Sequence, residues 1–150
     1  MRRVPGQRED NQIDEETLLW WTTAVRKKAA EVDRAVVADI HIGQLLAHSS
    51  RDPEDGAWPH RVVRNLIEKL EAEHIEEGLV TERINMRGVY TKDLYEGGIQ
   101  ERALASQYRS WADISRAQWP RMARVLEMVA QSWEGHAHRE DMRAEQQKLD

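Results

Sequence analysis

The strongest constraint on the fold is an apolar stripe near the end of the sequence, which repeats with the period of an α-helix. Its residues recur at intervals of three and four and are Met122, Val125, Leu126, Val129, Ala130, Trp133 and Ala137. A helix with one such stripe must bury it against another element. The segment before it carries a second stripe, formed by Leu104, Tyr108, Trp111, Ala112 and Ser115. Pro120 separates the two stripes, so we predict an antiparallel helical hairpin over residues 97–150.

The N-terminal part combines a polar stretch with a helical pattern. Residues 1–13 contain proline, glycine and several charged side chains, and we expect a flexible N-terminal arm there. Asp14 and the two glutamates after it suit the start of a helix, with Asn11 or Asp14 as its N-cap. Apolar residues at helical spacing then predict a helix over residues 17–38. The β-branched residues that follow predict a short strand over residues 39–42 before the chain turns helical again at 43–48.

The middle of the chain alternates between turn-forming and regular segments. Residues 48–58 are rich in Ser, Asp, Pro and Gly and predict a loop. Pro59 suits the start of a helix that continues to Glu77, with Gly78 as its stop. In residues 79–94, two short β-prone stretches flank an Asn-Met-Arg-Gly turn, which predicts a β-hairpin. The expected fold class is therefore mainly α with a small β-hairpin (α+β).

This order of elements over residues 17–98 resembles the winged helix-turn-helix family. The resemblance is carried by LIEKLEAEHIEEGLV, then by MRGVY and YEGG. It implies a winged-helix-like unit over residues 14–96, whose third helix enters the major groove of DNA and whose wing contacts phosphates. The side chains that it assigns to DNA are His60, Arg61, Arg64 and Asn65 on the helix, and Arg83, Arg87 and Lys92 on the wing.

The distribution of charge favours a second interpretation. The net charge is −5, and most of the excess acid lies in residues 51–100, which include the helix assigned to DNA. Negative charge beside a phosphate backbone weakens the electrostatic attraction that supplies most non-specific affinity. The alternative is an acidic helical adaptor, or an accessory subunit of a larger complex, that makes no contact with nucleic acid.

Large aromatic side chains lie on the two C-terminal helices. Their segment also resembles one found in uncharacterised small bacterial proteins, through ALASQYRSWA, WPR and REDMRAE, and that resemblance implies no activity. The aromatic residues either close the hairpin from within or form an interface with a second copy or another protein. These residues are Tyr108, Trp111, Trp119 and Trp133.

The sequence contains no motif that is typical of a catalytic site. P-loop, GxGxxG, GxSxG and HExxH patterns are absent, and the lack of cysteine excludes disulfides and thiolate chemistry. Glu71 with His74, and Glu134 with His138 and Asp141, have the spacing of metal ligands. On charged helices such groups are more often solvated ion pairs, so we expect no metal and no cofactor.

We therefore expect a small, non-enzymatic, cytoplasmic binding protein. Its expected partners are a second copy in a homodimer, another protein, or double-stranded DNA. We expect no membrane contact, because no uncharged run approaches the roughly 20 residues that cross a bilayer.

Overall fold

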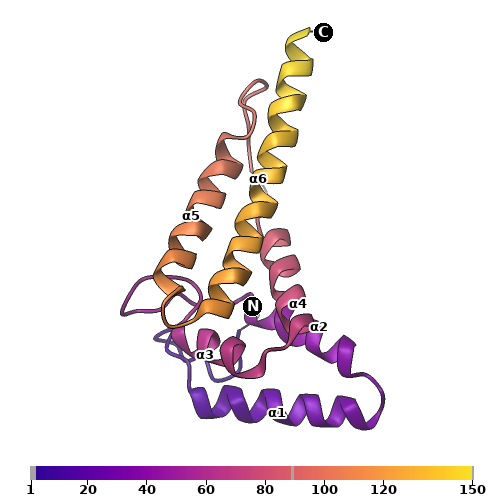
Figure 1. Cartoon of the computed structure of the whole chain (residues 1–150), viewed down its shortest axis with the longest axis vertical. Helices are drawn as coiled ribbons and strands as arrows, with labels where there is room; N and C mark the ends of the chain where they lie inside the picture. Colours follow the sequence, from indigo (N-terminus) through magenta and orange to yellow (C-terminus); the bar gives the residue numbers. More distant parts are fainter. Residues whose placement is uncertain (1–2, 89, 150) are drawn as a thin grey trace.

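The computed structural model describes residues 3–88 and 90–149, and within them it contains six α-helices and no β-strand. One isolated antiparallel bridge joins Gln7 and Ile13. The last two helices of the chain stand side by side as a hairpin on a base made by the other four (Figure 1). The helices are α1 (Glu15–Glu31), α2 (Ala35–Leu46), α3 (Arg61–Leu70), α4 (Glu73–Asn85), α5 (Ile99–Ser115) and α6 (Pro120–Leu149).

The predicted C-terminal hairpin is confirmed in α5 and α6. Every residue of the predicted α6 stripe is at most 4% exposed. Ion pairs between the two helices join Arg102 to Asp141 and Arg109 to Glu134. The residue numbers along α6 therefore decrease as those along α5 increase. The two helices are therefore antiparallel, and α6 continues beyond the start of α5 (Figure 1).

The predicted winged helix and its β-hairpin are wrong. Residues 39–42, expected as a strand, lie inside α2, and residues 79–85 of the expected hairpin belong to α4. The structure gives a reason in the contact between α2 and α4. A Cβ atom at Gly43 would lie 1.9 Å from the carbonyl oxygen of Ile75, and one at Gly78 would lie 2.2 Å from that of Ile40. Only glycine permits this approach, and packing of the two helices outweighs the weak β-propensity of the segment.

The helix expected over residues 59–77 is two helices. Glu71, rather than Gly78, ends the first of them, with a left-handed φ of 49°. Gly78 lies inside α4, where it serves the contact with α2 instead of a helix end. The break also turns His74 outward, so its side chain is 44% exposed and does not join the apolar stripe of α3.

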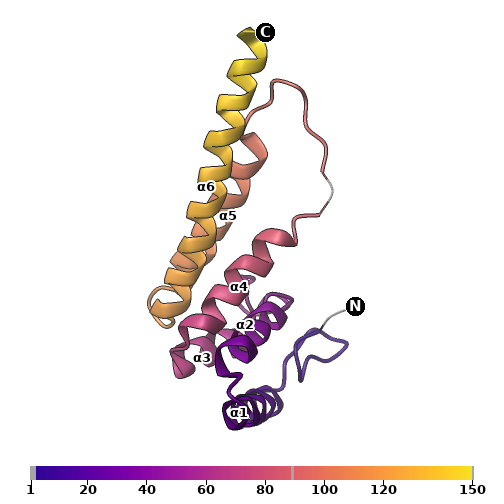
Figure 2. The same cartoon turned by 90° about the vertical axis from the view of Figure 1, so that its right-hand side faces the viewer.

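Residues 3–13, expected as a flexible arm, form a folded loop beside the base (Figure 2). Val4 and Ile13 are buried there, and the backbone N–H of Asp14 donates to the carbonyl of Gly6. Of the two candidate caps, Asp14 is the N-cap of α1, because its side chain accepts a hydrogen bond from the N–H of Thr17. The loop thus fixes the entry of the chain into α1.

One hydrophobic core runs through the base and into the hairpin. Trp58, from the loop before α3, packs edge-on against Tyr108 of α5 with ring centroids 6.1 Å apart. Trp111 of the same helix lies 6.2 Å from Trp58. The aromatic residues therefore join the two parts of the molecule.

Candidate functional site

The residues assigned to DNA are drawn into the interior or into ion pairs on the surface. Arg64 is the clearest case, since its side chain is 0% exposed. Its guanidinium donates to both carboxylate oxygens of Asp55, at 2.6 and 2.9 Å, and to the carbonyls of Pro59 and Ala57. It also lies 4.7 Å from the ring centre of Trp119. The amphipathic pattern placed Arg64 on the outer face of its helix, but the acidic loop before α3 covers it.

Asp52 organises that loop and holds Arg61. Its carboxylate is buried and accepts bonds from the N–H groups of Glu54 and Asp55 and from the backbone and side chain of Arg61. Burial raises the pKa of this carboxyl, but the hydrogen bonds from Arg61 and the backbone outweigh it and hold the pKa well below its usual range. The acids that seemed to oppose DNA binding thus neutralise the cations of α3.

His60 and Asn65 also have partners within the chain. His60 is buried and caps α3, because its Nδ1 accepts from the N–H of Val62 while its Nε2 lies 3.1 Å from the side-chain oxygen of Gln12. This pairing requires the neutral ring, and burial lowers the pKa of His60. Asn65 donates to Glu15 of α1 and accepts from Trp119.

The three residues assigned to a wing bind the hairpin instead. Arg83 donates to the hydroxyl oxygen of Tyr108, at 2.6 Å, and its guanidinium lies 4.1 Å from the ring centre of Trp58. Arg87 and Lys92 both pair with Glu101, which is 1% exposed at the start of α5. Burial raises the pKa of Glu101, and the hydrogen bonds from the two cations lower it by more. The connection between α4 and α5 is therefore tied down by these two residues.

The four aromatic residues assigned to a partner interface are each 4–6% exposed. Trp119 and Trp133 lie beneath Arg64 and Arg87, while Tyr108 and Trp111 pack on Trp58. Both predicted sites, for DNA and for a partner, therefore meet in one contact between base and hairpin. In this structure, the cationic and the aromatic residues that the sequence singled out take part in packing the chain on itself.

The segments quoted for the two resemblances also have structural roles. In YEGG, Gly97 has φ of 69° and a Cβ there would lie 2.6 Å from a carboxylate oxygen of Asp141. That same carboxylate accepts from the N–H of Gly98, at 2.8 Å, and so caps α5 from α6. The hydrogen bonds from Gly98 and Arg102 lower the pKa of Asp141. Asp141, within REDMRAE, thus fixes α5 and α6 against each other.

The candidate metal ligands lie apart or in ion pairs. His74 pairs with Glu77, Glu134 pairs with Arg109, and Asp141 caps α5. Within residues 3–88 and 90–149, no three His, Asp or Glu side chains are grouped so that they could hold a metal ion.

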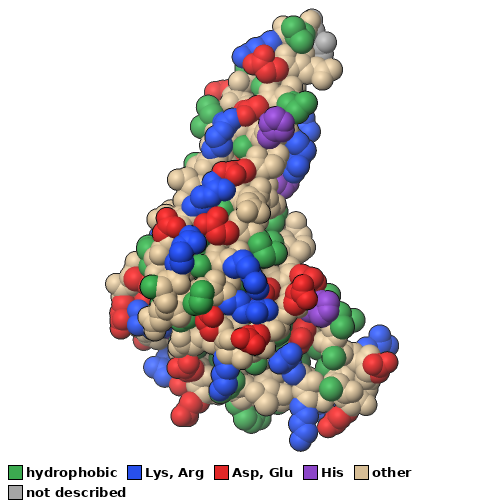
Figure 3. All heavy atoms as spheres, viewed as in Figure 1, with side chains coloured by type: hydrophobic (Ala, Val, Ile, Leu, Met, Phe, Trp, Pro, Cys, Tyr) green, Lys and Arg blue, Asp and Glu red, His purple; other side chains and the backbone are tan. Residues whose placement is uncertain are grey.

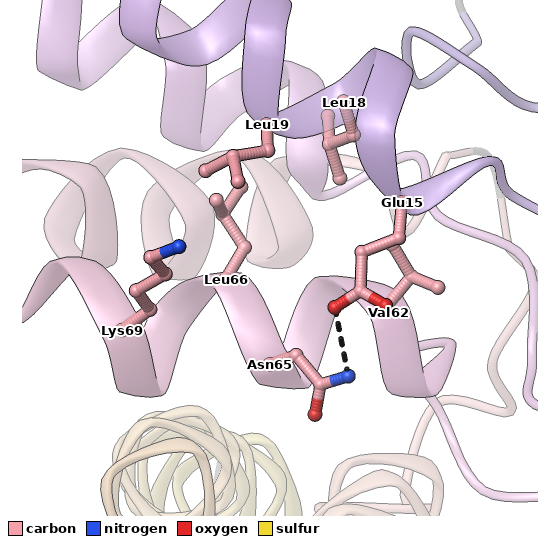
Figure 4. Close-up of a pocket in the computed structure, with 7 residues that line it drawn as sticks. All are labelled: Glu15, Leu18, Leu19, Val62, Asn65, Leu66 and Lys69. Atoms are coloured by element: carbon pink, nitrogen blue, oxygen red, sulfur yellow. Dashed lines mark hydrogen bonds between the residues drawn. The ribbon is translucent and has the colours of Figure 1, made fainter.

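A small cavity of about 80 Å³ lies between α1 and α3. Leu18 and Leu19 of α1 point toward Leu66 of α3, and the bond between Asn65 and Glu15 closes one end (Figure 4). Pockets for drug-sized ligands are typically about 300–1,000 Å³. This cavity is thus an imperfection of helix packing that has room for a few waters only.

An exposed apolar surface lies next to this cavity on α1, and Leu19 stands at the edge of both. There Trp20 is 71% exposed and borders an open groove of about 370 Å³. Figure 3 shows hydrophobic side chains at this lower edge of the molecule with charged groups on either side. We call this surface the outer face of α1; its residues are Glu16, Leu19, Trp20, Thr23, Ala24 and Lys27.

Sequence reasoning did not single out Trp20 and so missed this surface. A helical wheel contains the necessary signal. Leu18, Trp21 and Val25 define the buried stripe, and Trp20 lies about 200° around the helix from Leu18. Three more exposed valines mark the corner between α1 and α2, namely Val32, Val36 and Val37.

In comparisons with protein families, with curated proteins and with solved structures, nothing matches the chain. No described helix combines the length and the hydropathy that a membrane crossing requires. The geometry of the described residues therefore carries the functional argument.

Proposed function

We propose that the protein is a non-enzymatic, protein-binding adaptor or accessory subunit, and that the outer face of α1 is its contact surface. The exposure of Trp20 carries this proposal. Tryptophan is enriched among the residues that dominate binding energy, and an indole that is 71% exposed in a charged surface gains from burial. The groove beside it offers a place for a side chain of the partner.

The position of the cations supports a protein partner over nucleic acid. Each of the seven residues assigned to DNA has an intramolecular partner, and Arg64 is wholly covered. Contact with phosphates would require breaking these pairs, while the net charge of −5 opposes approach to a polyanion. Binding to DNA stays a prediction, as does the cytoplasmic location.

A photo-crosslinking experiment tests the contact surface. A photoreactive phenylalanine analogue replaces Trp20 in the full chain, and the matched control carries it at Met128, which is exposed on α6. We expect protein adducts from position 20 and none from position 128 when the protein is irradiated in its native cells. Equal yields from both positions, or none from position 20, would contradict the proposal.

A duplex titration tests the competing prediction. Fluorescence anisotropy with a random-sequence duplex at low salt is compared between the wild type and an Arg61→Glu variant, since Arg61 is the more accessible of the two arginines of α3. We expect no binding by either protein. Tight, salt-dependent binding that the substitution removes would establish the DNA function instead.

A further inference from the structure

We propose that the partner of the outer face of α1 is a second copy of this chain, with the two α1 helices antiparallel across a two-fold axis. The inference rests on the proposed function, because it names the occupant of the same surface. In a two-fold interface the same patch of both copies meets, so that residue i of one copy contacts residue j of the other and residue j contacts residue i. The patch must therefore be complementary to a copy of itself that runs in the opposite direction. The outer face of α1 meets this condition residue by residue.

The six residues of the face pair off about a point halfway between Trp20 and Thr23. Antiparallel pairing about that point places Glu16 opposite Lys27 of the second copy, and Lys27 opposite its Glu16. It places Trp20 opposite Thr23, and Leu19, which also packs against the core beside Leu66, opposite Ala24. Each pair thus joins opposite charges or a large apolar group with a small one, and no like charges meet.

The charges at the two ends of the face have no competing partners. Within residues 3–88 and 90–149, neither Glu16 nor Lys27 takes part in an ion pair, so neither charge would have to leave an existing partner. Glu16 and Lys27 lie about 16 Å apart along the helix axis, too far to pair with each other. A second, reversed copy supplies a partner to both.

The position of α1 leaves room for the second copy. The helix lies along the lower edge of the molecule, with the other helices all on one side of it (Figures 1 and 2). Only Leu18 and Thr22 of α1 are buried, and both point into the body. Because the contact is limited to a helix about 25 Å long, we expect a weak dimer with a dissociation constant on the order of micromolar.

Sedimentation equilibrium of the full-length chain over a concentration series tests the dimer. We expect a reversible monomer–dimer equilibrium that Trp20→Ala weakens at least tenfold, whereas Met128→Ala leaves it unchanged. Circular dichroism confirms that each variant is folded. A chain that stays monomeric at several hundred micromolar, or a dimer that Trp20→Ala does not weaken, would overturn the inference.

Charge reversal distinguishes this antiparallel pairing from any other dimer. Glu16→Lys and Lys27→Glu each set like charges against each other, so each should raise the dissociation constant about five- to tenfold. The double variant restores opposite charges at both ends and should return to within about twofold of wild type. An equimolar mixture of the two single variants should form heterodimers for the same reason. Failure of both rescues would exclude the pairing.

The crosslinking experiment separates this inference from the proposed function. If purified protein stays monomeric but position 20 still yields adducts with a different protein in cells, the surface binds a partner and only the identity with a second copy is wrong. If position 20 yields no adduct in either setting, both fail. An adduct of twice the chain mass in pure protein supports both.

Discussion

The indole N–H of Trp119 donates a hydrogen bond to the side-chain oxygen of Asn65, with the two atoms 2.7 Å apart. Asn65 belongs to the helix assigned to DNA, and Trp119 to the aromatic set assigned to a partner. Their bond joins α3 to the start of α6 within one chain. Polar groups that seemed available for recognition therefore hold the base and the hairpin together.

Arg64→Met should lower the free energy of unfolding by about 3 kcal/mol, because it removes the only cation that pairs with Asp55 in the described structure and takes the side-chain donor from the carbonyl of Pro59. Urea denaturation measures the change. Arg139→Met, at an exposed position without an ion pair among the described residues, is the matched control and should stay within about 0.5 kcal/mol of wild type. Equal losses in both variants would contradict the buried role of Arg64.

Gly78→Ala should destabilise the protein by about 2–3 kcal/mol, since the new methyl group would meet the carbonyl of Ile40 and force α2 and α4 apart. Gly135→Ala is the control within another helix. A Cβ there would come no closer than 3.6 Å to the end of a flexible arginine, so the higher helix propensity of alanine should raise stability by up to about 1 kcal/mol. The same sign for both substitutions, measured by thermal or urea unfolding, would refute the close crossing.

Stability should fall as the pH drops below 6.5, the usual pKa of histidine, because burial lowers the pKa of His60 in the folded state. The unfolded chain then binds the proton more readily, and protonation of Nδ1 also removes the acceptor for Val62 N–H. The charged groups around the ring that influence this titration are Asp52, Asp55, Arg61 and Arg64.

Urea unfolding at pH 8, 6.5 and 5 checks this dependence. His60→Asn keeps an acceptor for the cap but cannot titrate, so it should lose part of the pH slope. The rest comes from His136, whose pKa burial also lowers. A His60→Asn variant with the wild-type slope would rule out this role.

Asp141→Ala should cost about 1 kcal/mol, the usual value of a helix cap, because Gly98 N–H loses its acceptor and Arg102 its partner. Hydrogen exchange should become faster over the first turn of α5 and not over α3. Asp113→Ala removes an exposed ion pair within one helix and should have little effect. Unchanged exchange near Gly98 would show that α6 does not cap α5.

Helical period predicted the hairpin and the cap at Asp14, because each depends on residues close in sequence. The winged helix failed where distant contacts decide. Gly78 has the typical position of a residue that ends a helix, and the residues around it do not indicate that the backbone of α2 lies against it. Likewise, the burial of Arg64 depends on the acidic loop, which folds back over it. A count of charges along the chain does not show this contact, and it interprets the same acidic residues as a source of repulsion from DNA.

The contact of Trp58 with Tyr108 and Trp111 has a consequence for the connection between α4 and α5. These rings belong to one core that crosses from the base into the hairpin, while the connection itself runs outside it. A chain cut once within residues 90–95 should therefore remain a stable two-piece complex, held by the shared core. The covalent link there chiefly speeds the meeting of the two pieces during folding.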